Sequence, residues 1–462
     1  MKWFSTVFFI LLFCSFSNAQ QRWERTYGGA DYDAGYSVQQ TSDGGYIVAG
    51  ETSSFGNGIQ VYLIKTNSSG DTLWTKTHDV ADVDEGWSVQ QTQDGGYIVS
   101  GFTSTSVNAV QVFLAKTNST GDTLWTKTYG GARDDYGWSV RQTQDTGYIV
   151  AGMTTSFGSI EQVYLIKTNV TGDTLWTKTY GGTGGDAGNS VQQTTDGGYV
   201  IAGYSDYFVN GRQAYLIKTN SSGDTLWTRN FGGTSTEAGY SVQQTTDGGY
   251  IIAGYSNSFG DGYQVYLVKT NTSGDTLWTK TYGGAGLDWG YSVQQTTDSG
   301  YIVVGYTTSF GNAEQVYLIK TNASGDTLWT RTYGGTSTDE GYSVRQTTDG
   351  GYIVAGYTTS FGNGNQVYLI KTDSLGRSTG VEETAGVRGR KIEIRITAIP
   401  NPFTTFATLP GHEAERFSLY DISGRRVGTY KGDRIGEGLQ AGVYFLRTLE
   451  GKAGLARIVK VR

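Results

Sequence analysis

Hydrophobic and polar positions along the chain follow a repeating pattern of four short apolar runs separated by glycine-rich turns. One copy comprises residues 239–245 (GYSVQQT), 249–254 (GYIIAG), 264–270 (QVYLVKT) and 274–282 (GDTLWTKTY). The runs are rich in β-branched and aromatic residues, and Asp-Gly-Gly or Asn-x-Ser-Gly segments supply the positive φ of tight turns. The pattern predicts four antiparallel strands in each copy.

The four-strand unit recurs seven times at a constant spacing of 51 residues, which its tryptophans mark: Trp23, Trp74, Trp125, Trp176, Trp227, Trp278 and Trp329. Such repeats either stack as a solenoid or close as a propeller. The seventh copy lacks its fourth strand, whereas residues 21–29 match a fourth strand alone. A solenoid would leave both edges open. We therefore predict an all-β, seven-bladed β-propeller over residues 20–379 that the N-terminal strand closes.

The first 19 residues read as a secretory signal peptide, with Lys2, an apolar run and a small-x-small cleavage site that ends at Ala19. The one cysteine, Cys14, lies inside this segment, so the mature chain has no disulfide. We find no further apolar run of the length that a membrane helix needs. These features predict an exported chain without a transmembrane segment, which we expect to be a monomer.

Charge and proline content change near residue 380. Residues 1–380 hold 21 Lys and Arg against 33 Asp and Glu, a net charge of −12, whereas residues 381–462 hold 14 against 9, a net charge of +5. All three prolines lie in the second part. The acidic balance argues against nucleic acid as the ligand of the propeller. The shift predicts a linker at 380–390 and a second domain at 391–462.

One carboxylate precedes the first strand of every copy: Asp33, Asp84, Asp135, Asp186, Glu237, Asp288 and Asp339. Sevenfold closure would make these residues a ring around the central channel, where mutual repulsion would attract a cation with oxygen ligands, such as Ca²⁺. Alternatively, each one accepts hydrogen bonds from backbone N–H groups of the turn before the strand. Glu237 is long for such a turn. We predict no other cofactor.

Aromatic columns supply candidate ligand-binding residues. One column lies on the loop between the second and third strands: Phe55, Phe157, Phe208, Phe259, Phe310 and Phe361. Exposed rings would suit sugar stacking or a protein partner, whereas buried rings would pack blade against blade. Other positions vary between otherwise similar copies, among them the column that contains Trp87 and Trp138 and the loop that contains Trp289. Such variation reflects either ligand preference or drift.

The inventory for catalysis is poor. The chain has two histidines, His78 and His412, and they fall in different predicted domains. A histidine-based catalytic triad or zinc site is therefore not expected. Paired carboxylates hydrolyse glycosides, but a site repeated seven times lacks the asymmetry of one acid and one base. We predict that the protein is not an enzyme.

Residues 391–462 have a different pattern that predicts a small β-sandwich. Four motifs occur in order: Pro400, Asn401 and Pro402 at its entry; Tyr420, Asp421, Gly424 and Arg425 in a hairpin; Gly442 and Tyr444 in a strand; and a basic last strand with Lys460 and Arg462. Over about 70 residues this segment resembles the type A C-terminal sorting domain of the bacterial type IX secretion system. An ordinary docking sandwich is the alternative.

That resemblance implies passage through the periplasm and the outer-membrane translocon, followed by removal of the sorting domain by a sortase-like peptidase. The propeller would then be released or attached to surface lipopolysaccharide. Three functions remain open for it: a binding and adhesion scaffold for a surface protein, which the pattern favours; a carbohydrate-binding lectin; and a glycan-active enzyme, which is the weakest of the three.

Overall fold

The computed structural model describes residues 20–380, except 105–108, 159, 207–210 and 312, and parts of 405–460: residues 405–406, 408, 416–421, 425–431, 433–448 and 456–460. The expected signal peptide at 1–19, most of the expected linker at 380–390 and the strand expected at 392–397 lie outside the described residues. The chain folds as two compact units, Met1–Thr384 and Ala385–Arg462. No helix in the described part of the chain is long and apolar enough to cross a membrane.

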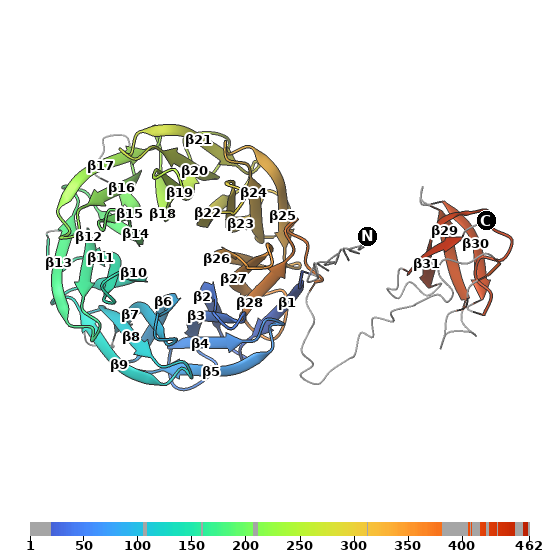
Figure 1. Ribbon diagram of the computed structural model, residues 1–462, viewed down its shortest axis with the longest axis horizontal. Coiled ribbons are helices and arrows are strands. Elements are labelled where there is room, and N and C mark those ends of the chain that lie inside the picture. The colour runs from blue at the N-terminus through green and yellow to red at the C-terminus, as the bar shows by residue number, and fades with distance from the viewer. Residues whose placement is uncertain are drawn as a thin grey trace, which may run out of the picture. The chain divides into compact units, whose positions relative to one another are not determined.

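The first unit is a seven-bladed β-propeller, in which seven four-stranded antiparallel sheets surround a common axis (Figure 1). Blades 1 to 3 contain β2 (Asp33–Gln40), β3 (Tyr46–Thr52), β4 (Gln60–Thr66) and β5 (Thr72–His78); β6 (Val83–Gln91), β7 (Tyr97–Ser104), β8 (Gln111–Thr117) and β9 (Thr123–Tyr129); and β10 (Asp135–Gln142), β11 (Tyr148–Thr154), β12 (Gln162–Thr168) and β13 (Thr174–Tyr180).

Blades 4 to 7 repeat the arrangement, and the last blade takes its outer strand from the N-terminus. They contain β14 (Asp186–Gln193), β15 (Tyr199–Ser205), β16 (Gln213–Thr219) and β17 (Thr225–Phe231); β18 (Glu237–Gln244), β19 (Tyr250–Ser256), β20 (Gln264–Thr270) and β21 (Thr276–Tyr282); β22 (Asp288–Gln295), β23 (Tyr301–Thr307), β24 (Gln315–Thr321) and β25 (Thr327–Tyr333); and β26 (Asp339–Gln346), β27 (Tyr352–Thr358), β28 (Gln366–Thr372) and β1 (Trp23–Tyr27).

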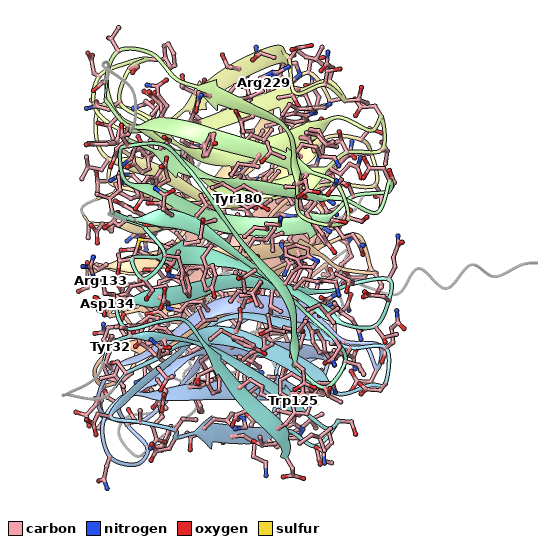
Figure 2. The ribbon with its side chains drawn as sticks, turned by 90° about the vertical axis from the view of Figure 1, so that its left-hand side faces the viewer. Tyr32, Trp125, Arg133, Asp134, Tyr180 and Arg229 are labelled. Carbon is pink, nitrogen blue, oxygen red and sulfur yellow. The ribbon has the colours of Figure 1, made fainter. Side chains whose placement is uncertain are left out.

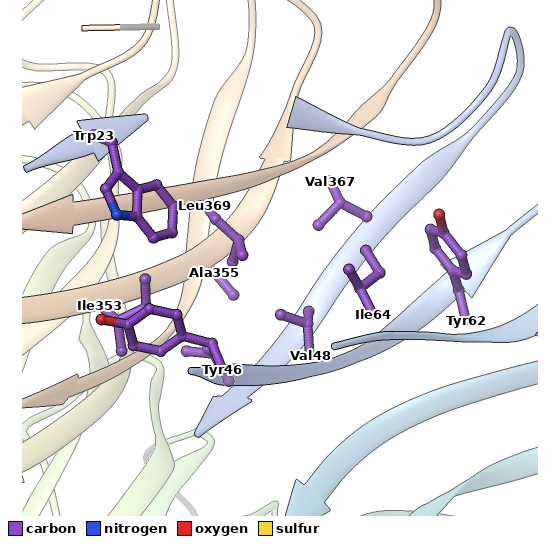
Figure 3. Close-up of a cluster of buried hydrophobic side chains, with 10 residues drawn as sticks. Trp23, Tyr46, Val48, Tyr62, Ile64, Ile353, Ala355, Val367 and Leu369 are labelled. Atoms are coloured by element: carbon purple, nitrogen blue, oxygen red, sulfur yellow. The ribbon is translucent and has the colours of Figure 1, made fainter. Parts of the chain in front are cut away.

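The hydrophobic core lies between neighbouring blades. The second and third strands of each blade are buried over nearly their whole length, because both of their faces meet another sheet. Figure 3 shows the cluster between blades 7 and 1, where Trp23, Ile353 and Leu369 of one blade pack against Tyr46 and Val48 of the other. Packing of this kind contributes about 25 cal/mol for each Å² of apolar surface that it buries.

Strand β1 pairs antiparallel with β28, from Trp23 opposite Lys371 to Tyr27 opposite Val367. The Trp23 indole N–H donates to Ser68 O in blade 1 over 3.2 Å, and the Tyr368 hydroxyl donates to Glu24. The N-terminal strand thus joins the last blade and contacts the first.

Hydrogen bonds also link all seven innermost strands. In each blade a serine hydroxyl accepts a hydrogen bond of 3.2 to 3.3 Å from a valine backbone N–H of the next blade, and Ser343 of blade 7 accepts from Val38 N of blade 1. The bonds therefore form an unbroken circle.

The described residues of the second unit form one four-stranded sheet in the order β30, β29, β31, β32. Its strands are β29 (Arg416–Asp421), β30 (Arg426–Lys431), β31 (Gly442–Thr448) and β32 (Ala456–Lys460). The sandwich expected from the sequence needs a second sheet, and its first strand was expected at 392–397, outside the described residues. The two-sheet arrangement therefore stays a prediction.

Candidate functional site

The residues of the seven copies are more alike at one end of the blades than at the other. We call the end with the turns at 41–45 and 67–71, and their equivalents, the hairpin end. The loop end holds the links at 28–32 and the loops at 53–59, and their equivalents. Figure 2 shows Tyr32, Arg133 and Asp134 together on the loop end. Hydrogen bonds join its two sets of loops, as from Asp31 N to Ser54 Oγ over 3.0 Å.

The hairpin end repeats one polar arrangement in all seven blades. In blade 1 the Lys65 ammonium, which is 3 % exposed, donates to Asp43 Oδ1 over 3.1 Å and to Thr66 O over 2.9 Å. Burial raises the pKa of Asp43, but hydrogen bonds from Lys65, Thr41 and the Gly45 N–H outweigh it and lower the pKa to about 2. Equivalent ion pairs of 2.9 Å occur in each of the remaining blades.

At the loop end a β-bulge brings varied side chains to the innermost strands. In every blade the register shifts at one residue between a glycine and a serine, as between Gly35 and Ser37. A bulge leaves one residue unpaired and redirects its side chain. The bulge residues, all partly exposed, are Tyr36, Trp87, Trp138, Asn189, Tyr240, Tyr291 and Tyr342.

The bulge side chains of five successive blades contact one another around the axis. Tyr36 and Trp87 are stacked, with ring centroids 4.3 Å apart and planes 6° from parallel. Tyr342 lies edge-on to Tyr36 at 5.2 Å, Tyr291 lies 5.0 Å from Tyr342, and Tyr240 lies 5.2 Å from Tyr291. Blades 2, 1, 7, 6 and 5 therefore share one aromatic arc.

Beside the bulge, two further columns of differing residues are cross-strand partners. Position 34 of the first strand lies opposite position 51 of the second, and the seven pairs are Ala34 with Glu51, Glu85 with Phe102, Tyr136 with Met153, Ala187 with Tyr204, Ala238 with Tyr255, Trp289 with Tyr306 and Glu340 with Tyr357. The residues that differ most between copies thus lie together at one end of the ring.

Glu51 of blade 1 and Glu85 of blade 2 form a carboxyl pair that is hydrogen-bonded to the two stacked rings. The two carboxyl groups are close enough to share a hydrogen bond. The Tyr36 hydroxyl donates to Glu51, and the Trp87 indole N–H donates to Glu85 Oε2 over 2.9 Å. Burial and then the charge of Glu51 raise the pKa of Glu85 to about 8. The pair therefore holds a proton at neutral pH and can release it to accommodate a cation.

Blade 7 adds a third carboxyl group with a raised pKa to the same arc. Glu340 accepts hydrogen bonds from the hydroxyls of Tyr342, over 3.0 Å, and Tyr357, over 3.1 Å. Burial raises the pKa of Glu340, although both tyrosines act to lower it. Three neighbouring blades therefore present carboxyl groups among aromatic rings.

At the loop end of blade 4, a cationic side chain of the propeller itself lies between an aromatic ring and a carboxylate. The Arg212 guanidinium lies 3.8 Å from the centroid of the Tyr204 ring and pairs with both carboxylate oxygens of Asp206, at 2.8 and 3.0 Å. Next to this arrangement, a hollow of about 620 Å³ is lined by Arg133, Asp134, Thr155, Ile160, Glu161 and Gly185. The loop end can therefore hold a guanidinium in this way.

Trp289, which the sequence singled out, is the centre of an aromatic cluster in blades 5 and 6. Its ring stacks on Tyr255 at 4.2 Å and lies 6.0 Å from Tyr306 and 5.8 Å from Tyr263. Trp138, in contrast, stacks on Tyr136 of its own blade at 5.8 Å. Of the three candidate tryptophans, only Trp87 lies beside the carboxyl pair.

The hydrogen bonds of the seven carboxylates expected to form a ring support the turn-cap alternative. Each is fully buried and accepts a hydrogen bond from the turn that precedes its own strand, and Glu237 and Asp339 also accept from Gln213 and Gln315 of the preceding blade. Asp33 accepts from Gly29 N over 2.8 Å and from Ser54 Oγ over 2.7 Å, and the six others accept from the equivalent turns. Among the described residues no three carboxylate, histidine or cysteine side chains could hold a metal ion.

The phenylalanine column is largely exposed. Phe55 is 41 %, Phe157 50 %, Phe259 42 % and Phe310 47 % exposed, so blade-to-blade packing does not account for these rings. Each ring instead contacts the ring of a tyrosine of its own blade, with ring centroids 5.4 to 5.7 Å apart. Phe361 is partly buried against the core of blades 6 and 7, and Phe208 lies outside the described residues.

In the C-terminal unit the motif residues that the structure describes make local contacts. Asp421 accepts hydrogen bonds from Arg425 N and Arg425 Nε, both 3.1 Å long, and so caps its hairpin. The Tyr444 hydroxyl donates to Gln440 O over 2.9 Å, and Gly442 pairs with Lys460 across β31 and β32. Tyr420 pairs with Phe445. Pro400, Asn401, Pro402, Gly424 and Arg462 lie outside the described residues.

Comparison with solved structures returns other propellers. The chain is similar to the WD40 domain of Pan2 from Neurospora crassa, with 10 % identity, a TM-score of 0.46 and coverage of 76 % of this chain and 91 % of that one. Sqt1 from Chaetomium thermophilum has 11 % identity and a TM-score of 0.45, with coverage of 96 % of this chain and 99 % of that one. BamB from Moraxella catarrhalis has 14 % identity and a TM-score of 0.36, with coverage of 75 % of this chain and 85 % of that one. Likeness at this level concerns the fold alone.

No protein-family model matches the chain, and no curated protein matches it. The class therefore rests on the strand pairing itself: the first unit is a seven-bladed β-propeller with one end of varied, aromatic and acidic side chains.

Sequence reasoning missed the carboxyl pair, although the signal was present. Glu51 and Glu85 are departures from the repeat, because most copies have an aromatic residue at position 51 and alanine is the commonest residue at position 34. Their proximity depends on which strands are neighbours between blades, and a repeat alignment does not give this.

Proposed function

We propose that the mature propeller is a binding scaffold at the outer cell surface or in the medium. Its loop end contacts a protein partner, and the cluster of Glu51, Glu85, Tyr36 and Trp87 binds a lysine or arginine side chain of that partner. One observation carries the proposal. The seven copies agree at the hairpin end, but at the loop end they differ, and there aromatic and acidic residues contact one another.

The chemistry of this cluster suits a cation. Aromatic faces attract an ammonium or guanidinium group, and desolvation makes the attraction worth about 2 kcal/mol. A cation beside Glu85 favours its charged form, so binding releases the proton that the pair holds. The arrangement of Arg212 between Tyr204 and Asp206 supports the same mode of recognition on the same face.

Calorimetric titration with an acetylated hexa-arginine peptide tests the proposal, with a hexa-glutamate peptide as the negative control. We expect the wild-type chain to bind hexa-arginine, and more tightly as pH rises through about 8, the pKa of Glu85. The double variant E51Q/E85Q should bind at least about tenfold more weakly, which corresponds to about 1.4 kcal/mol.

A charge-matched control removes two carboxylates from the hairpin end instead. Asp173 and Asp224 lie on third-to-fourth-strand turns and pair with Lys127 and Lys178. The variant D173N/D224N should keep the affinity within about twofold, because exposed pairs contribute little. Equal losses of affinity in the two double variants would show that the peptide binds by general charge attraction, and would refute the proposed site.

Export by the type IX route is part of the same proposal and rests on the C-terminal motifs. In a bacterium with this secretion system, the chain without residues 391–462 should accumulate in the periplasm, whereas the full chain should reach the surface or the medium. Surface display of the truncated chain, measured by protease accessibility on intact cells, would refute the sorting role. We also propose that the propeller binds its ligand without transforming it.

The exposed phenylalanines favour a second candidate, carbohydrate binding. Sugar rings stack on exposed aromatic faces, and four of these rings present 41 to 50 % of their surface at equivalent positions of four blades. A glycan array decides between the candidates. Binding that is lost in F55A/F157A/F259A/F310A but kept in E51Q/E85Q would support the lectin over the protein scaffold, and no binding to any sugar would remove it.

A further inference from the structure

A second unusual position lies on the innermost strands, near the hairpin end. The column comprises Gln39, Gln90, Arg141, Gln192, Gln243, Gln294 and Arg345. In all five glutamine blades the side-chain Oε1 accepts a hydrogen bond of 2.6 to 2.7 Å from a backbone N–H of the next blade. Glutamine at this position therefore links one blade to the next.

Arginine cannot make that link, because a guanidinium has five donors and no acceptor. Arg141 donates to Val140 O over 2.8 Å and to Ser88 Oγ over 3.5 Å. Arg345 repeats both contacts with Val344 O and Ser292 Oγ at the same distances. These bonds use one nitrogen of each guanidinium, so several N–H donors of each remain for another partner.

The two arginines also lie on the innermost strands of blades 3 and 7, and among the described residues no ion pair to either guanidinium occurs. Burial, followed by the charge of Arg141, lowers the pKa of Arg345 to about 9. Burial lowers the pKa of Arg141 as well. Within the described part of the chain no carboxylate contributes to either shift. Because two like charges in this position repel, a bound anion would stabilise the pair.

We propose that a small oxyanion, an inorganic phosphate or sulfate or the same group on a sugar, binds between Arg141 and Arg345 near the axis of the propeller. The planar fork of a guanidinium matches two oxygens of such a group, and two forks from different blades can grip it from different sides. Glutamine amides of the same column can add N–H donors. This site lies toward the end opposite the acidic loop end and does not depend on the proposed function.

Calorimetric titration of the mature chain with sodium phosphate and sodium sulfate, at constant ionic strength in chloride, tests the site. We expect half-saturation at about 0.1 to 1 mM and a higher melting temperature with the ion, because a ligand that binds only the native state stabilises it. The variant R141Q/R345Q should bind at least tenfold more weakly. Since five blades carry glutamine here, the variant should also melt at a higher temperature than wild type without the ion.

A charge-matched control removes two arginines from outer strands. In R229Q/R331Q the response to phosphate should be that of the wild type, because Arg229 pairs with Asp275 and Arg331 donates to Thr330 O. Glucose 6-phosphate distinguishes the source of the group: tighter binding than free phosphate would assign it to a sugar, and weaker binding to the free ion.

Equal phosphate and sulfate titrations for wild type and R141Q/R345Q, or no binding of any of the three probes by wild type, would overturn the proposal. Should the double variant fail to fold, the single variants R141Q and R345Q provide the same comparison. Each is expected to weaken binding severalfold, and unchanged affinity in both would equally refute the site.

Discussion

The hairpin end and the loop end of the propeller belong to the same strands, yet they use carboxyl groups in opposite ways. At the hairpin end Asp43 and its six equivalents are held ionised by a lysine, a threonine hydroxyl and a backbone N–H. At the loop end burial among aromatic rings raises the pKa of Glu51, Glu85 and Glu340. One end stabilises each blade in the same way, and this leaves the other end free to differ between blades.

The largest effect should come from Trp23, which joins blade 7 to blade 1 at the hairpin end. Its side chain is 5 % exposed and packs edge-on against Tyr46 at 5.8 Å. We expect W23A to lower the free energy of unfolding by about 3 to 5 kcal/mol, in proportion to the apolar contacts that it removes. Urea denaturation measures the change.

The matched control, W138A, removes the same residue type from the loop end, where Trp138 is partly exposed. The free energy of unfolding lost in W138A should be less than half of that lost in W23A. A cost as large as that of W23A would show that the loop end also supports the ring, and the contrast between the two ends would fail.

Next in size is the buried lysine of blade 3. Lys167 is buried and donates to Asp145 and to Thr168 O, so K167M leaves a buried carbonyl and an exposed carboxylate without their partner. We expect a loss of about 2 to 3 kcal/mol in the free energy of unfolding, measured by urea denaturation. K178M in the same blade breaks an exposed pair with Asp224 and should cost less than about 1 kcal/mol. Equal costs would contradict the structural role of the buried pairs.

The two ends should also respond to pH in opposite directions. Because the pKa of Glu85 is about 8 in the folded chain and near 4.5 when unfolded, the folded state binds more protons between these values. Folding stability therefore falls as pH rises from about 5 through 8. At the hairpin end Asp43 has a lowered pKa of about 2, so its contribution is lost as pH falls below about 4.

Urea denaturation of wild type and E85Q between pH 5 and 9 isolates the loop-end contribution. The difference between the two free energies of unfolding should change by about 1.4 kcal/mol or more, the equivalent of one pKa unit, with wild type losing stability relative to E85Q as pH rises. Parallel curves would mean that Glu85 is ionised throughout and that the pair holds no proton.

The smallest effect concerns the turn glycines of the hairpin end. Thr146, with φ of 66°, stands where blades 1 and 2 have Gly44 and Gly95 with φ of 83° and 82°. A residue with Cβ is strained there, so T146G should raise the free energy of unfolding by about 1 kcal/mol. The reverse change, G95T, should lower it by a similar amount, and calorimetric melting measures both. No difference in either variant would show that these turns tolerate any residue.

The sequence alone predicts much of the fold because the information is local and repeated. Constant spacing of Trp23 and its equivalents sets the number of units, and Asp-Gly-Gly turns set the strand ends. The site is harder to predict. The Glu51–Glu85 and Arg141–Arg345 arrangements join different blades, and they arise where a residue departs from the repeat. Asp33 shows the converse, since a column of equivalent carboxylates left a cation ring and a turn cap open, and only the hydrogen bonds of the structure favour the turn cap.

Hydroxyl-radical footprinting of residues 20–462, with and without hexa-arginine peptide, tests most directly whether the loop end is the binding surface. We predict that the peptide protects Tyr32, Tyr36 and Trp87 from oxidation and leaves the hairpin-end leucines Leu124 and Leu175, which are 58 % and 56 % exposed, unchanged. Protection of those leucines without protection of Tyr36 and Trp87, or protection spread evenly over both ends, would contradict the account.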